Sequence, residues 1–75
     1  MFNKNIFSNR LKSLRKSKGI SQTVLAELLA VTKTQISDLE NGKTTTSIER
    51  FCILADYFNV SLDYLVGRSD DPTRR

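Results

Sequence analysis

The sequence predicts an all-α fold, in which five short helices form a single compact domain. Apolar residues recur at separations of three and four, the period of an amphipathic helix, and no segment alternates as a strand does. A Ser or Thr hydroxyl precedes four of the five segments, as is typical of helix N-caps. Length and composition agree, because 75 residues with 39% hydrophobic and 27% charged side chains suit one ordinary globular domain.

The first helix is expected over residues 7–18, and Gly19 ends it after a basic last turn. Its apolar face consists of Phe7, Leu11 and Leu14. Six basic residues precede Gly19 with no acidic residue among them, namely Lys4, Arg10, Lys12, Arg15, Lys16 and Lys18. This basic segment is either a solvated helix face or a patch for an anionic partner, which the net charge of +4 also permits.

The second and third helices are expected over residues 22–29 and 33–41, with Ser21 and Thr32 as their N-caps. Their inner faces consist of Leu25, Ala26 and Leu29 in the second, and Ile36 and Leu39 in the third. Only "AVT" separates them, which is too short a connection for a long antiparallel pair. We therefore expect the two helices to meet at a steep angle.

A fourth helix over residues 48–58 follows the polar "KTTT" loop, and a short fifth helix covers residues 62–66. Ser47 and Ser61 are their N-caps. These elements place the domain at residues 1–67. The final segment, residues 68–75, reads "RSDDPTRR" and is expected to be a flexible tail or the start of a linker.

Several classes of function are excluded by composition. The chain has no histidine and one cysteine, so it has neither a Cys/His cluster for zinc nor a Ser-His or Cys-His pair for catalysis. We expect no enzyme activity, no metal and no cofactor, and we expect Cys52 to be a small buried apolar residue. No apolar run is long enough to span a membrane and no export signal is present, which favours the cytoplasm.

The outer arc of the third helix is unusual for a purely structural helix. A surface helix commonly carries long Lys and Glu side chains, but this arc carries mostly short hydrogen-bonding ones. Its residues are Lys33, Thr34, Ser37, Asp38 and Asn41, with Gln35 at the margin. Such side chains suit close approach to the major groove of DNA, where Lys donates to guanine, Thr meets a thymine methyl and Asp accepts from cytosine.

The stretch from Arg10 to Gly67 resembles the Cro-type phage-repressor helix-turn-helix family, also called the xenobiotic-response-element (XRE) family. The motifs that carry the resemblance are "GISQTVLAELL", "VTKTQISDLENGK" and "ILADYFNVSLDYL". The resemblance implies a five-helix lambda-repressor-like domain of bacterial or phage origin. It also implies that the second and third helices form the helix-turn-helix, with the third entering the major groove of double-stranded DNA.

The family pattern then gives roles to individual residues. The positions implied to read bases are Lys33, Thr34, Gln35, Ser37 and Asp38, and those implied to hold phosphates are Gln22, Asn41, Lys43 and Thr44. Arg15 and Glu40 are implied to be a structural ion pair between the first and third helices. The chain departs from the family at Ala30, where a glycine is usual in the turn, so either the turn is strained by a left-handed alanine or its geometry differs slightly.

One short recognition helix makes few base contacts, so two copies are expected to act together as a homodimer on an inverted repeat. Tyr57, Tyr64 and Val66 are the candidate dimer residues, unless they only complete the core. The resemblance implies a transcriptional regulator, most plausibly a repressor, and the chain is either a complete small regulator or part of a longer one. The alternative is a protein-interaction module of the same fold, an antitoxin or antirepressor-binding partner, which an exposed Leu28 would favour.

Overall fold

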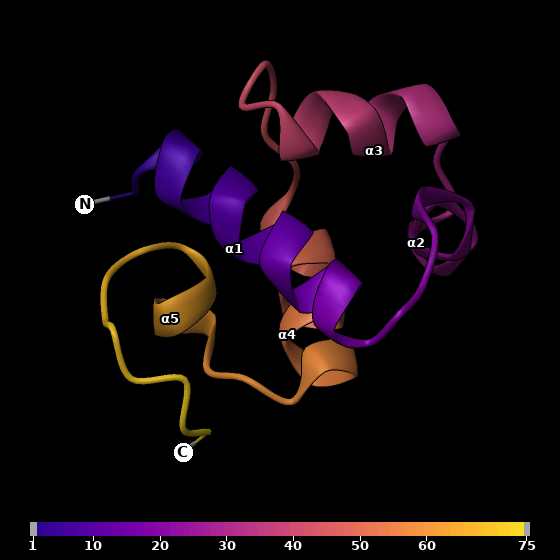
Figure 1. Cartoon of the computed structure of the whole chain (residues 1–75). Coiled ribbons are helices and arrows are strands. Elements are labelled where there is room, and N and C mark those ends of the chain that lie inside the picture. Colours follow the sequence, from indigo (N-terminus) through magenta and orange to yellow (C-terminus); the bar gives the residue numbers. More distant parts are fainter. Residues whose placement is uncertain (1, 75) are drawn as a thin grey trace.

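A computed structural model describes residues 2–74 of the protein and confirms the all-α prediction. Over those residues it contains no strand and five helices (Figure 1), namely α1 (Lys4–Ser17), α2 (Gln22–Leu29), α3 (Lys33–Glu40), α4 (Ile48–Phe58) and α5 (Leu62–Leu65). The second and fourth helices have the expected bounds. The third and fifth each end one residue earlier than expected, because Asn41 and Val66 are their C-caps.

Each helix begins at a side-chain oxygen that accepts a hydrogen bond from a backbone N–H of its first turn. The expected caps Ser21, Thr32, Ser47 and Ser61 all act in this way. The first helix begins three residues before the expected bound because Asn3 caps it. The Asn3 carboxamide oxygen accepts from the N–H groups of Asn5 and Ile6 at 3.0 and 3.1 Å, which satisfies two donors of that turn.

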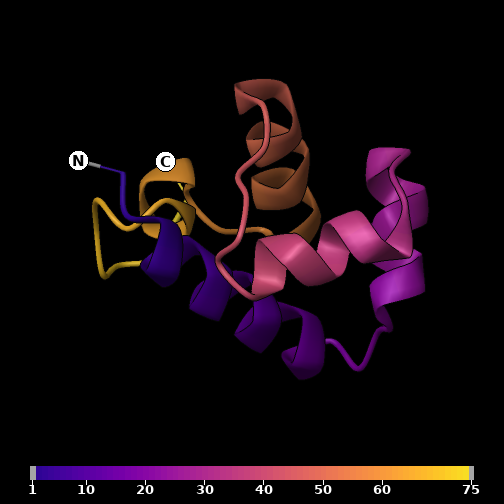
Figure 2. The same ribbon diagram turned by 90° about the horizontal axis from the view of Figure 1, so that it is seen from above.

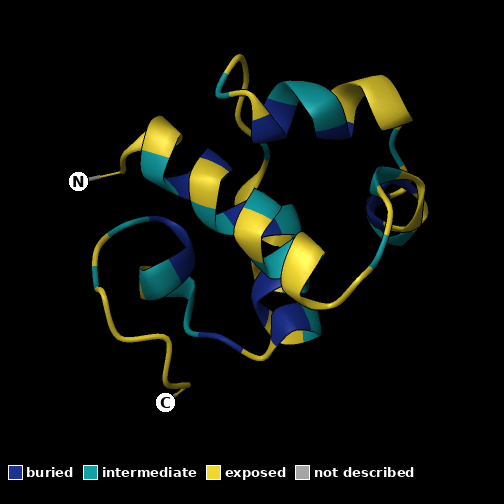
Figure 3. Ribbon diagram, viewed as in Figure 1, coloured by how far each residue is buried: buried dark blue, intermediate teal, exposed yellow. Residues whose placement is uncertain are grey.

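The core joins one apolar face from every helix. The side chains that are fully buried are Phe7, Leu11, Leu25, Ile36, Leu54 and Leu65. Phe7 of α1 and Phe51 of α4 meet edge to face with ring centroids 4.8 Å apart, which is a favoured geometry for two aromatic rings. Figure 3 shows the buried residues of α1, α3 and α4 on the sides that face the centre of the molecule.

The helix pair α2 and α3 is packed across a tight turn, as the short connection predicts. In Figure 1 α2 is viewed along its axis while α3 is seen from the side, so the two helices are steeply inclined. Seen from above in Figure 2, α3 lies between α1 and α4 and meets α2 at one end. One long side of α3 is therefore left uncovered by the other helices.

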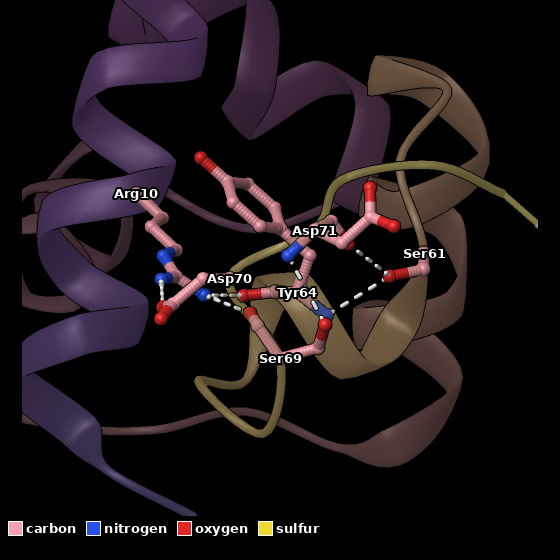
Figure 4. Close-up of polar contacts among 6 residues, drawn as sticks. All are labelled: Arg10, Ser61, Tyr64, Ser69, Asp70 and Asp71. Atoms are coloured by element: carbon pink, nitrogen blue, oxygen red, sulfur yellow. Dashed lines mark hydrogen bonds and ion pairs between the residues drawn. The ribbon is translucent and has the colours of Figure 1, made fainter.

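The segment after α5, expected to be a flexible tail or the start of a linker, is held against the helices by two arginines. Arg10 of α1 donates to the carbonyl of Ser69 at 2.7 Å, forms an ion pair with Asp70 at 2.8 Å and donates to the carbonyl of Tyr64 (Figure 4). The segment is polar in composition, and hydrogen bonds to its backbone carbonyls keep it in place.

The second arginine holds the end of the described segment. Arg74 donates to the carbonyl of Ala55 at 2.7 Å and pairs with Asp56 at 2.6 Å, both near the end of α4. Between the two arginines, the carbonyl of Pro72 accepts from the N–H of Ser61 at 3.0 Å. Residues 68–74 therefore close over α5 as an ordered loop, whereas residue 75 lies outside the described range.

The expectation that Cys52 is buried is wrong, since the structure places it on the exposed face of α4. The inward face of this helix consists of Phe51, Leu54, Ala55 and Phe58. Cys52 directly follows Phe51, and one helical step of about 100 degrees turns it away from the core.

The turn between α2 and α3 contains a left-handed alanine, which is one of the two alternatives that the sequence leaves open. Ala30 has φ 56° and ψ 45°, and its N–H donates to the carbonyls of Ala26 and Glu27. An L-residue in this region places its Cβ too close to the following carbonyl oxygen, which costs about 1–2 kcal/mol. The turn of the helix pair is therefore slightly strained.

Replacing Ala30 by glycine should relieve this strain. We expect Ala30→Gly to raise the free energy of unfolding by about 0.5–1 kcal/mol, because the greater freedom of glycine in the unfolded chain offsets part of the gain. Thermal unfolding followed by circular dichroism measures the change. Asn59→Gly is the matched control, since Asn59 has the same conformation with φ 55° but asparagine tolerates it, so its gain should be smaller. A lower melting temperature for Ala30→Gly would contradict the strain.

Candidate nucleic-acid interface

The two sides of α3 differ in the manner expected of a recognition helix. Ile36 and Leu39 are 0% and 4% exposed and anchor the helix on the core. The opposite side carries the residues that the sequence assigns to base reading: Lys33, Thr34 and Gln35 are exposed, and Ser37 and Asp38 are half-buried. Figure 3 shows this side of α3 in the colours of exposed and intermediate residues.

Gln35 has a structural task that its assignment as a base reader does not include. The side-chain oxygen of Gln35 accepts from the N–H of Thr32 at 2.8 Å, and the Thr32 hydroxyl accepts from the N–H of Gln35 at 3.1 Å. This reciprocal capping box satisfies backbone donors at the start of α3. Only the amide NH₂ group of Gln35 is left for an acceptor outside the protein.

A buried carboxylate joins three helices beneath this surface. The Glu40 side chain, 1% exposed at the end of α3, accepts from Arg15 of α1 at 2.6 and 3.1 Å in a bidentate ion pair. Gln22, the first residue of α2, donates its amide to the same carboxylate at 3.1 Å. Arg15 also donates to the carbonyl of Ile20 at 3.0 Å. The structure therefore brings Arg15 and Glu40 together and adds Gln22 to them.

The Arg15 guanidinium carries its positive charge over the whole physiological pH range. Its hydrogen bond to the Glu40 carboxylate raises the pKa of Arg15 above its ordinary value, burial opposes this increase, and the negative charge of Glu40 adds to it. Arginine is already protonated at any pH at which proteins fold. The Arg15 side chain consequently remains a cation in the ion pair.

The loop after α3 carries the other residues assigned to phosphates. Asn41, Lys43 and Thr44 are all exposed, and the Asn41 amide donates to the Ser37 hydroxyl at 3.3 Å. Gly42 turns the chain with φ +73°, where an added Cβ would lie 3.0 Å from the Asn5 side-chain oxygen. The loop is thus held close to α1, at the same end of α3 as Glu40.

The three candidate dimer residues do not form one exposed apolar patch. Val66 is 9% exposed and belongs to the core. Tyr57 and Tyr64 are half-buried, and a cation lies over each ring. The Lys18 amine is 4.7 Å from the centroid of the Tyr57 ring, and the Arg10 guanidinium is 4.1 Å from the centroid of the Tyr64 ring. The expectation for Val66 is corrected, because this C-cap residue of α5 packs among the residues of the core.

The contact of Gln22 with Glu40 is the part of the site that sequence patterning did not predict. The two residues are 18 positions apart and belong to different helices, so no periodic signal relates them. Gln22 was assigned to phosphate only, and its position in the first turn of α2 is compatible with both contacts. An amide has two N–H donors, of which Glu40 takes one.

The described residues contain neither a membrane-spanning helix nor a cluster of metal ligands. No helix in the range 2–74 is both long and apolar enough to cross a bilayer. Within the same range, no three Cys, Asp or Glu side chains are gathered in a way that could hold a metal ion.

Comparison with known proteins places this geometry in a family. The family model described as "Helix-turn-helix" matches residues 11–65, which include α2, α3 and α4 entirely. Among curated proteins, the uncharacterized HTH-type transcriptional regulator YobD of Bacillus subtilis is 31% identical over 67 residues, covering 89% of this chain and 60% of YobD. The antitoxin PezA of Streptococcus pneumoniae is 36% identical over 62 residues, covering 83% of this chain and 39% of PezA.

Among solved structures, the P22 c2 repressor in complex with a synthetic operator is similar with a TM-score of 0.77. The two chains are 26% identical, and the match covers 85% of this chain and 97% of the repressor chain. The chain spans less than two thirds of the length of YobD and PezA, so both relatives contain further sequence.

The buried ion pair predicts a large effect on stability. We expect Glu40→Ala to lower the free energy of unfolding by about 3–5 kcal/mol, because it leaves the Arg15 cation, 14% exposed, without its partner. Thermal or urea unfolding measures the change. Asp70→Ala is the control, since Asp70 is fully exposed and Arg10 keeps two carbonyl acceptors, so its melting temperature should change little. Equal melting temperatures for Glu40→Ala and the unmodified protein would refute a structural role for the pair.

Proposed function

This chain belongs to the helix-turn-helix family, and from that premise we propose that it is a transcriptional regulator that binds double-stranded DNA sequence-specifically. The outer face of α3 is the observation that carries the proposal. It presents short polar side chains on the side of the helix opposite Ile36 and Leu39, and no other helix of the described range covers it. The major groove admits a helix of this kind and displays the donors and acceptors that such side chains read.

In this proposal, residues of α3 have distinct partners. Lys33 donates to guanine, Thr34 meets a thymine methyl and Asp38 accepts from a cytosine amino group. Gln35 and Ser37 flank these contacts. Phosphates on either side are held by Gln22, which has a second amide N–H at the start of α2, and by the loop residues Asn41, Lys43 and Thr44.

We further propose that the protein acts as a repressor and binds an inverted repeat as a homodimer. The similarity to a phage repressor whose structure contains an operator supports this reading. A helix of eight residues reads only a few base pairs, so a second copy supplies the affinity that one genomic site requires. Two half-sites would then be centred about 34 Å, or about 10 base pairs, apart. For a bacterial or phage-encoded regulator, the place of action is the cytoplasm.

A protein-interaction module of the same fold is the second candidate, because a relative is named as an antitoxin. Leu28, which favoured this reading from the sequence, is half-buried and packs against the core. Val24 and Ile48 instead expose 38% and 66% of their surface, which leaves apolar area for a protein partner. A stoichiometric partner that purifies with the protein and displaces DNA from it would favour this candidate.

Selection of binding sites from a random duplex pool tests the main proposal. At about 150 mM salt, where contacts to phosphates alone are weakened, we expect enrichment of one sequence with inverted symmetry. Half-site centres about 10 base pairs apart would identify a dimer on one face of the duplex. A pool that remains random after several rounds would refute sequence-specific binding.

Variants of α3 test which residues read bases. We expect Thr34→Ala and Asp38→Ala each to relax preference at one base position per half-site by roughly 1 kcal/mol, and to leave the other positions unchanged. Repeating the selection with each variant measures this. Thr23→Ala is a matched control, since Thr23 is an exposed threonine on α2, and its selected sequence should equal that of the unmodified protein. Uniform loss of affinity without altered preference would remove both residues from base reading.

A further inference from the structure

A polar hollow of about 430 Å³ lies between the N-terminal half of α1 and the end of α3. Both ribbon views place these two segments side by side (Figures 1 and 2). The side chains that α1 contributes to it are Asn5, Ser8, Asn9 and Lys12. Glu40, Asn41 and Gly42 line the opposite wall. Lys12 has been assigned no role so far.

Lys12 differs from its neighbours in the basic segment. It is half-buried, whereas Lys16 and Lys18 are exposed. Within residues 2–74, its amine makes no hydrogen bond or ion pair, and because no buried side-chain nitrogen of that range lacks a partner, this amine is open to solvent at the hollow. Asn9, one turn earlier, also makes no side-chain bond in that range. The hollow thus gathers donors that lack an acceptor.

The carboxylate on the opposite wall does not supply that acceptor. Glu40 is held by the bidentate ion pair with Arg15 and by the amide of Gln22, at distances of 2.6 to 3.1 Å. The guanidinium of Arg15 offsets the negative charge of this carboxylate, whose side chain is 1% exposed. The unmatched charge in the hollow is consequently that of Lys12, which is positive.

The wall formed by the loop is built close to α1. A Cβ on Gly42 would lie 3.0 Å from the Asn5 oxygen and in ordinary contact, at 3.5 Å, with the Ser8 hydroxyl oxygen, so the loop packs closely against α1. The approach brings Asn41 to the rim of the hollow, beside the exposed Lys43. Donors from α1 and from the end of α3 therefore converge on one space.

We infer that this hollow binds one phosphate of the DNA backbone, with the Lys12 amine as its charge partner and the Asn9 and Asn41 amides as hydrogen-bond donors. The inference rests on the proposed function, because a recognition helix in the major groove has a row of phosphates along each flank. The hollow lies at the end of α3, next to the loop proposed to hold phosphates. It extends the DNA-binding surface from the helix pair onto α1.

The salt dependence of binding tests the role of Lys12. We measure the dissociation constant for the enriched duplex at 50 and 200 mM salt, for the unmodified protein and for Lys12→Gln. Losing one phosphate contact lowers the slope of log K against log salt by about 0.9, so the ratio of the two constants should fall by about 3.5-fold. For Lys12→Arg, the ratio of the dissociation constants at the two salt concentrations should stay close to that of the unmodified protein, because arginine keeps the positive charge.

Lys18→Gln is the matched control, since it removes the same charge from the same basic segment. The Lys18 amine lies 4.7 Å from the centroid of the Tyr57 ring on α4 rather than beside α3, and the ratio should stay unchanged. Asn9→Ala is a second variant that leaves Lys12 in place. It should weaken binding about 3-fold at both salt concentrations without changing the ratio, because it removes a neutral donor.

Single methylphosphonate substitutions along the duplex identify the phosphate. At one phosphate position, the substitution should weaken binding of the duplex by the unmodified protein and leave binding by Lys12→Gln unchanged. Equal salt ratios for Lys12→Gln and Lys18→Gln, on a duplex that the unmodified protein binds, would overturn the phosphate site and leave the proposed function intact. No binding of any duplex by the unmodified protein would overturn both.

Discussion

The position of α3 depends on the carboxylate of Glu40. It lies at the end of a helix of eight residues that only Ile36 and Leu39 anchor in the core. Two apolar contacts restrain a short helix weakly against rotation about its axis. The ion pair with Arg15 and the hydrogen bond from Gln22 add directional contacts to α1 and α2. Because a buried charge without partners is strongly unfavourable, the three helices are held in one arrangement.

This arrangement leaves Thr34 and Asp38, in the middle of the outer face of α3, without a side-chain contact that the fold needs. The capping box of Thr32 and Gln35 satisfies the first turn, and Glu40 fastens the last. Thr34 and Asp38, between them, make no side-chain hydrogen bond within the described range. Side chains that the fold does not need can vary to suit a binding partner. Thr34 and Asp38 lie where a groove of DNA would meet the helix.

The basic segment of α1 is not a single patch, because its cations have different surroundings. Arg15 is buried against Glu40, and Arg10 holds the loop after α5. Lys18 lies over the ring of Tyr57. Lys12 is left with its charge unpaired, next to the end of α3. In the sequence these basic residues look equivalent. In the tertiary structure some of them stabilise the fold, and Lys12 is left for binding.

The amino-acid sequence by itself determined the five helices, four of their five N-caps and the steep helix pair, since these follow from local spacing and from side chains that bond within a few residues. It also determined which side of α3 is polar. The Asn3 cap of α1 and the left-handed conformation of Ala30 were decided by the structure. Only the tertiary structure decided that Gln22 shares the carboxylate of Glu40, that residues 68–74 close over α5 and that Val66 is a core residue. Each of these depends on contacts between distant parts of the chain, and periodicity along one helix carries no information about them.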